Sequence, residues 1–158
     1  MIHQPDQPNR RRALKLLGSL ALGLAGGVLA QQGRALRGLE ATLYKSPTCG
    51  CCGEYVKFLQ AQGALVQVVL QDDLGPIKRR YGIPPQAQSC HTLRLAGYTV
   101  EGHVPFEALQ KLLRERPRID GIALPGMPLG TPGMPGPKTQ PYRVLALVKG
   151  RLEPFITL

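Results

Sequence analysis

Three of the chain's four cysteines, Cys49, Cys51 and Cys52, lie within four consecutive positions of the segment KSPTCGCCGEY. The thiolate is the reactive form of cysteine and a soft metal ligand, so the cluster is suited to disulfide exchange, to a structural disulfide or to soft-metal binding. Cys49 and Cys52 have the C-x-x-C spacing of a redox pair and precede a helical pattern. Because a helix N-terminus stabilises thiolates, this position predicts reactive thiols.

Cys51 distinguishes the cluster from a simple redox pair. A third thiol between the other two favours scrambled disulfides, whereas Cu(I) and Zn(II) both accept several thiolates in a small volume. We therefore favour soft-metal binding over a purely redox or structural use. Ordinary disulfides are the alternative, because four cysteines in an oxidising compartment allow three connectivities.

The fourth cysteine, Cys90, lies in the segment QSCHT, just before a predicted strand. In a thioredoxin-like fold this segment approaches the reactive turn from the opposite side. We therefore expect Cys90 to face Cys49 and Cys52 across a cleft, so that sulfur atoms from two distant segments converge.

Two histidines and two methionines are further candidate ligands. His91 directly follows Cys90, and His103 lies in EGHVP. Either histidine could bind a metal or orient a ligand, and a hydrogen-bonding structural role is the alternative for both. Met127 and Met134 lie in GMPLGTPGMPG, where a thioether could bind Cu(I) or fill an apolar gap.

The first thirty residues have the features of an export signal. The run RRRALK supplies a charged start that resembles the twin-arginine pattern, and an apolar stretch follows up to Ala30. That stretch contains glycines and is shorter than the roughly 20 residues of a spanning helix. We expect a cleaved signal peptide over 1–30, a short linker over 31–40 and a domain over 41–158.

Export predicts a periplasmic location, where disulfides persist, with no stable membrane span after processing. An uncleaved membrane anchor is the alternative. The chain carries a net charge of +10, but its basic residues outside the signal are scattered, for example in 78–80 and 114–118. Because nucleic-acid binding requires a continuous basic surface, we expect no nucleic-acid partner.

The order of the predicted elements indicates an α/β fold. Strand, helix and strand patterns occupy 41–46, 53–63 and 64–71, and the valine-rich 64–71 is predicted to be a buried strand in a parallel pair. A short helix over 72–83 precedes a hairpin over 91–104 that turns at Ala96-Gly97.

The clearest helical pattern, 105–117, completes the order of a thioredoxin or glutaredoxin core. A proline- and glycine-rich loop over 124–141 and a hairpin over 142–158, turning at Lys149-Gly150, then extend it. The sequence thus predicts a thioredoxin-like fold with a C-terminal Pro/Gly loop and hairpin extension.

Four segments, YKSPTCGCCGEYVKFLQAQG, GIPPQAQSCHT, GYTVEGHVP and ALPGMPLGTPGM, closely resemble the exported CopG-type proteins of bacterial copper-resistance clusters. The resemblance covers about residues 41 to 148. It implies a thioredoxin-like protein that binds copper through its cysteines, with several Cu(I) ions in a thiolate-bridged cluster. Carried over to this chain, the ligands are the four cysteines Cys49, Cys51, Cys52 and Cys90.

Two functions follow as hypotheses. The first is a periplasmic copper-binding protein in copper resistance or homeostasis, with copper ions and other periplasmic copper-resistance proteins as partners and zinc as a second candidate ion. The second is a thiol-disulfide oxidoreductase in which Cys49 attacks and Cys52 resolves, with disulfide formation coupled to reduction of Cu(II). Arsenate reduction, which requires one dominant nucleophile with an arginine nearby, fits the crowded thiols poorly. The sequence leaves the oligomeric state open.

Overall fold

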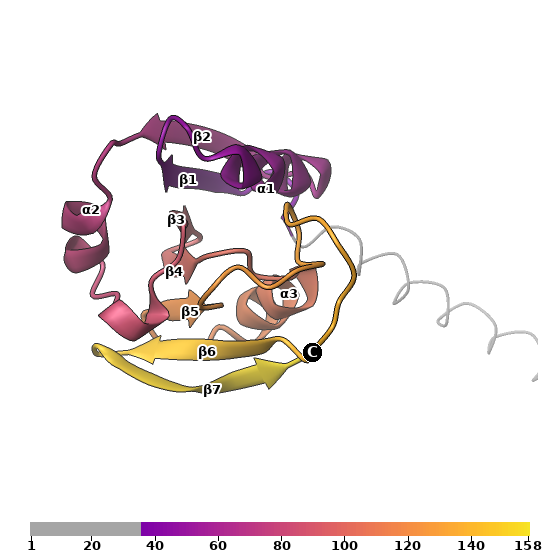
Figure 1. Cartoon of the computed structure of the whole chain (residues 1–158). Helices are drawn as coiled ribbons and strands as arrows, with labels where there is room; N and C mark the ends of the chain where they lie inside the picture. Colours follow the sequence, from indigo (N-terminus) through magenta and orange to yellow (C-terminus); the bar gives the residue numbers. More distant parts are fainter. Residues whose placement is uncertain (1–35) are drawn as a thin grey trace, which may run out of the picture. The chain divides into compact units, whose positions relative to one another are not determined.

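The computed structural model describes residues 36–158, which form a mixed α/β domain around one seven-stranded sheet of order β2-β1-β3-β4-β5-β6-β7 (Figure 1). The predicted signal peptide and the first half of the predicted linker lie outside the described residues. The remaining linker residues belong to the domain, because Leu36 is fully buried in the core and the first strand begins at Glu40.

The first unit is β1 (Glu40–Lys45), α1 (Gly50–Ala61) and β2 (Leu65–Leu70), with β1 and β2 paired in parallel as predicted. Apolar residues spaced for one helical face bury α1 against the sheet, with Tyr55 and Leu59 fully buried. Helix α1 ends before Gly63, whose φ of +91° lies in the left-handed region that favours glycine.

Strand β2 is the edge of the sheet, and the prediction of a buried strand was wrong there. Its side chains at Leu65, Val68 and Leu70 are 60%, 41% and 56% exposed. A run rich in valine fits a pleated strand at any place in a sheet, and its composition does not say how many neighbours it has. In the part of the chain that the structure describes, β1 is the one strand paired with β2, and β2 leaves much of its apolar surface exposed.

The central hairpin agrees with its prediction. Strands β3 (His91–Leu95) and β4 (Tyr98–Glu101) pair antiparallel around Ala96 and Gly97, whose φ values are +49° and +89°. Two consecutive residues with positive φ are typical of the tight turn that matches the twist of paired strands. Helix α2 (Gly75–Arg80) precedes this hairpin.

A short 3-10 helix, η2 (Pro85–Ala87), lies between α2 and β3. The remaining elements are α3 (Phe106–Glu115), β5 (Gly121–Ala123), β6 (Arg143–Val148) and β7 (Arg151–Thr157). The helix and the β6–β7 hairpin were predicted, whereas the three-residue β5, parallel to β4, was not. Among the described residues, no helix is long and apolar enough to cross a bilayer. The mixed α/β class is confirmed, and the finer thioredoxin-like assignment stays a prediction.

The loop over 124–141 returns from β5 to the start of α1 (Figure 1). At Gly133 the loop packs tightly on this helix, because a Cβ atom there would lie 2.8 Å from both the Cys51 carbonyl oxygen and the Tyr55 nitrogen. The fold therefore brings this loop against the cysteine-bearing turn.

Candidate metal centre

The first cysteine group lies where the chain leaves β1 and enters α1. Cys49 is the N-cap residue of α1, with extended backbone angles, and its N–H donates to the Ser46 carbonyl at 3.2 Å. Cys51 and Cys52 belong to the first helical turn, and Cys52 is fully buried. The three cysteines therefore lie at a helix N-terminus, as predicted.

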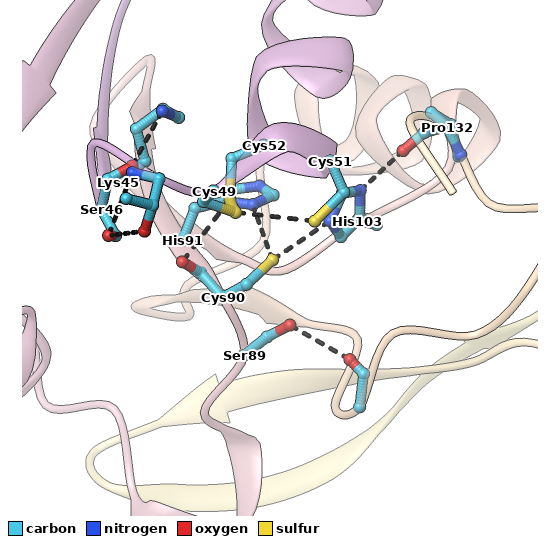
Figure 2. Close-up of a disulfide and its surroundings, with 12 residues drawn as sticks. Lys45, Ser46, Cys49, Cys51, Cys52, Ser89, Cys90, His91, His103 and Pro132 are labelled. Carbon is cyan, nitrogen blue, oxygen red and sulfur yellow. Dashed lines mark hydrogen bonds between the residues drawn. A yellow bond between two sulfur atoms is a disulfide. The ribbon is translucent and has the colours of Figure 1, made fainter. Parts of the chain in front are cut away.

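Cys90 approaches this turn from the segment before β3 (Figure 2). Its carbonyl oxygen lies 3.7 Å from the Cys52 sulfur. The sulfur atoms of Cys49, Cys51, Cys52 and Cys90 all lie within 4.8 Å of one another. The predicted convergence of two distant segments is thus confirmed, and a ligand role for these sulfur atoms stays a prediction.

Cys49 and Cys52 form a disulfide, whereas Cys51 and Cys90 are free thiols. The Cys51 sulfur lies 3.5 Å from that of Cys49, beside the disulfide. Two electrons and two protons would convert the disulfide to thiols and make all four sulfur atoms available as ligands. The redox state of this pair therefore sets how many thiolate donors the centre offers.

The thiol of Cys90 has an environment unlike that of a helix N-terminus. Burial, followed by the neighbouring Cys51, raises its pKa to about 12. At neutral pH this thiol is protonated, so a metal ion must displace its proton to bind. The prediction of reactive thiolates therefore does not extend to Cys90.

Both candidate histidines are fully buried and contact Cys90. The Nδ1 of His103 lies 2.7 Å from the Pro132 carbonyl oxygen, which accepts its proton and leaves Nε2 as a lone-pair atom 3.1 Å from the Cys90 sulfur. The Nδ1 of His91 lies 3.4 Å from the same sulfur, and its buried Nε2 has no hydrogen-bond partner within residues 36–158. Burial, as the largest cause, lowers the pKa of both imidazoles.

Tyr55 of α1 packs against both imidazoles, and the sequence analysis gave it no role at the centre. Its ring centroid lies 4.7 Å from that of His91 and 5.3 Å from that of His103. Its hydroxyl donates to the Val104 carbonyl at 2.8 Å, and burial raises its pKa. Tyr55 therefore holds the two rings in place from the core side, as its place on the buried face of the predicted helix could have suggested.

A buried carboxylate, which the sequence analysis did not identify, supports the Cys90 segment. Glu101 of β4 is fully buried and accepts hydrogen bonds from the Ser89 backbone N–H and the Thr92 hydroxyl, each at 2.7 Å. Lys78 of α2, also buried, forms an ion pair with it. Burial of the carboxylate raises its pKa, and these partners oppose that effect.

The two candidate methionines lie in the loop over 124–141. Met127 is 48% exposed. Met134 is half-buried and follows Gly133, which touches the first turn of α1. Their role as ligands stays a prediction.

Comparison with known proteins adds two findings. A family profile described as a protein of unknown function, DUF411, matches residues 87–134. A solved structure named copper resistance protein copG, form 2, shares 38% identity and a TM-score of 0.70, covering 76% of this chain and 98% of the other. Form 1 of copper resistance protein copG gives 37% identity and a TM-score of 0.69 over 76% and 97% of the two chains. No curated protein sequence matches the chain.

Proposed function

Because the chain belongs to the CopG-type family of copper resistance proteins, we propose that it binds copper in the periplasm and acts in copper resistance. The ion would be Cu(I), held by Cys49, Cys51, Cys52 and Cys90. The observation that supports this most directly is that four sulfur atoms from two segments lie within 4.8 Å of one another. Copper ions are the ligand, and other periplasmic copper-resistance proteins are the expected recipients.

The donor set fits Cu(I) chemically. Soft thiolates favour Cu(I), and Zn(II) is the second candidate because thiolates also bind it. Bound Cu(I) ions could share thiolates between them, so that the four sulfur atoms hold more than one ion. Since a disulfide sulfur is not a thiolate, the Cys49–Cys52 pair must be reduced before the full set can form.

The thioredoxin-like assignment and the periplasmic location belong to the same proposal. The parallel β1-α1-β2 unit and the antiparallel β3–β4 pair followed by α3 support the first. The arginine-rich start of the sequence supports the second. His91, His103, Met127 and Met134 are additional candidate ligands of lower rank.

A Cu(I) titration tests the proposal. The reduced protein, kept without oxygen, should take more than one Cu(I) per chain in competition with a chromophoric Cu(I) chelator. Cys51→Ser should lower both the number bound and the affinity, because it removes a thiolate from the set. Thr48→Ser in the same turn is the matched control and should bind as the wild type does. Failure of the wild type to compete with a weak chelator would refute the proposal.

A second candidate function is thiol-disulfide exchange, which the Cys49–Cys52 disulfide at the start of α1 favours. Oxidation of the two thiols would release two protons and two electrons, and two Cu(II) ions would accept the electrons as they become Cu(I). Anaerobic addition of Cu(II) to the reduced protein should then yield two Cu(I) per disulfide formed. Cys49→Ser should abolish disulfide formation between 49 and 52, whereas Cys51→Ser should leave it intact.

A further inference from the structure

Cys90 belongs to two groups of candidate ligands, the four cysteines and a set made with His91 and His103. In the structure the Cys49–Cys52 disulfide removes two thiols from the first group and none from the second. We propose that the oxidised protein holds a borderline divalent cation, of the class of Zn²⁺ and Cu²⁺, through Cys90, His91 and His103. This position extends the proposed copper site, with which it shares Cys90.

The spacing of the donor atoms is close to that of a metal site. In a tetrahedral Zn²⁺ site, with a sulfur at about 2.3 Å and nitrogens at about 2.0 Å, the sulfur and a nitrogen lie roughly 3.5 Å apart. The Cys90 sulfur lies 3.4 Å from His91 Nδ1 and 3.1 Å from His103 Nε2. One donor atom from each of the three residues lies within 4.8 Å of the other two. Small side-chain movements would therefore bring the donors to bonding positions.

The surroundings of His103 match those of a metal-binding histidine. Such a histidine donates its second ring N–H to a carbonyl or carboxylate, which fixes the tautomer and the ring orientation. The Pro132 carbonyl accepts the Nδ1 proton of His103 at 2.7 Å, and Figure 2 shows the other side of the ring directed at Cys90. Through Pro132, the loop over 124–141 thus holds His103 with the lone pair of its Nε2 directed at the site.

The second histidine supplies an independent observation. His91 is fully buried, and its Nε2 has no hydrogen-bond partner among the described residues. Buried polar atoms normally find a partner, so an unpaired imidazole nitrogen beside a free thiol needs an explanation. A cation would bind His91 through Nδ1, the ring nitrogen 3.4 Å from the Cys90 sulfur, and would hold in place a ring that no hydrogen bond at Nε2 orients.

The donor types determine which cation fits. Two imidazoles and one thiolate suit borderline ions such as Zn²⁺ and Cu²⁺, whereas a set of thiolates alone favours Cu(I). A fourth ligand position is open to water or to the free Cys51 thiol. Reduction of the Cys49–Cys52 pair therefore changes the preference of the centre from a borderline divalent ion to a soft monovalent one.

Cobalt(II) is a suitable probe, because it occupies zinc sites, is coloured when tetrahedral and does not oxidise thiols. Without oxygen or reductant, the protein with its disulfide intact should bind one Co²⁺ per chain, with visible tetrahedral bands and a near-ultraviolet thiolate-to-cobalt transition. Added Zn²⁺ should displace it. Binding without the sulfur transition, or no binding at all, would overturn the proposal.

Variants identify the donors. Cys90→Ser and His103→Gln should each weaken Co²⁺ binding by at least about tenfold, because each removes one of the proposed ligands, and losing even a residue that orients a ligand costs about that much. Thr48→Ser is the matched control, since it lies in the turn before Cys49, alters none of the three proposed donors and should bind Co²⁺ as the wild type does. Loss of Co²⁺ binding in Cys51→Ser with retention in Cys90→Ser would overturn the assignment.

A measurement on the unmodified protein covers the case in which a histidine variant fails to fold. X-ray absorption of the zinc-loaded, oxidised protein should show two imidazole nitrogens and at least one sulfur around the ion. A shell of sulfur alone, or of oxygen and nitrogen alone, would contradict the proposal. If the reduced protein binds Cu(I) but the oxidised protein does not bind Co²⁺, this inference fails and the proposed function stands.

Discussion

The carboxylate of Glu101 accepts the backbone N–H of Ser89 at 2.7 Å and so fixes the residue that precedes Cys90. The same carboxylate accepts the Thr92 hydroxyl and pairs with Lys78. Helix α2, the segment before β3 and strand β4 therefore meet at one buried group. Because this group touches no sulfur in the centre, Glu101 acts as a positioning residue for the Cys90 segment.

Replacing Glu101 by Gln should destabilise the fold strongly. The amide keeps the shape of the side chain but leaves the buried Lys78 ammonium without a counter-charge, a change that typically costs about 3–5 kcal/mol. Urea denaturation of the two proteins measures the difference in the free energy of unfolding.

The exposed pair of Lys111 and Glu115 supplies a matched control, since its side chains are 28% and 42% exposed. Glu115→Gln should cost much less stability than Glu101→Gln, because solvent screens an exposed ion pair. Equal losses in the Glu101 and Glu115 variants would show that burial of the Glu101 pair has no energetic consequence.

The thiol of Cys90 should react slowly with iodoacetamide. Its pKa is raised to about 12 by burial and by Cys51, so the thiolate fraction at pH 8 is far below that of an ordinary thiol. The Cys51→Ser protein with its disulfide intact leaves Cys90 as the single free thiol and allows a direct measurement.

In that variant the contribution of Cys51 is gone, but burial, the larger cause, still raises the pKa of Cys90, so the rate should keep rising with pH beyond 9, the ordinary value for a thiol. Cys90→Ser, which leaves Cys51 as the free thiol, serves as the comparison. A rate for Cys90 that levels off below pH 9 would contradict burial of this thiol.

The sequence predicted the parts of the centre that depend on short patterns. The C-x-C-C run before a helical periodicity located Cys49, Cys51 and Cys52, and the turn residues predicted the β3–β4 and β6–β7 hairpins. The place of Cys90 opposite the turn followed from the order of the elements, because that order fixes which segment lies beside the start of α1.

The carboxylate network could not be predicted in the same way. In YTVE, alternation along the strand places Thr99 and Glu101 on the polar face, which would be exposed if nothing covered it. Both are buried, and the buried Lys78 of α2 pairs with Glu101 on that side. Lysine and arginine side chains are usually exposed, so the sequence predicts that all three residues of the run Lys78–Arg80 face solvent. Only the packing of α2 shows that Lys78 is buried.

The metal-free protein should lose stability in mild acid because of His91. Its pKa is lowered well below the ordinary value, by burial first and by His103 and Lys78 next. Above pH 6.5 both the folded and the unfolded imidazole are neutral; below it the unfolded form gains a proton that the folded form resists. The stability is therefore present above pH 6.5 and declines as the pH falls towards the folded pKa.

Urea denaturation at pH 7.5 and 5.5 measures the effect, which should be on the order of 1 kcal/mol for a histidine that stays neutral when folded. NMR of the imidazole carbons of His91 should show a neutral ring at the lower pH. A charged His91 in the folded protein at pH 5.5, or an unchanged free energy of unfolding, would contradict the assignment.

Gly133 should tolerate a side chain less well than a glycine of similar backbone conformation in the same loop. Its φ is +84°, and a Cβ atom there would lie 2.8 Å from the Cys51 carbonyl oxygen and 3.2 Å from His103 Nδ1. Gly133→Ala should push the loop away from α1 and weaken the hydrogen bond between His103 and the neighbouring Pro132.

Gly136→Ala is the control that separates the effect of the close contact from the effect of backbone strain. Gly136 has a φ of +95°, but its Cβ would meet nothing closer than the Leu129 side chain at 3.6 Å. Both variants carry the strain of a left-handed alanine, of order 1 kcal/mol. Thermal unfolding should show that Gly133→Ala loses about 1–3 kcal/mol more of the free energy of unfolding than Gly136→Ala does, as overpacked sites do. Gly133→Ala should also bind Co²⁺ more weakly in the oxidised state. Equal losses in the two variants would mean that the loop is free to move from the cysteine turn and does not hold His103 against Cys90.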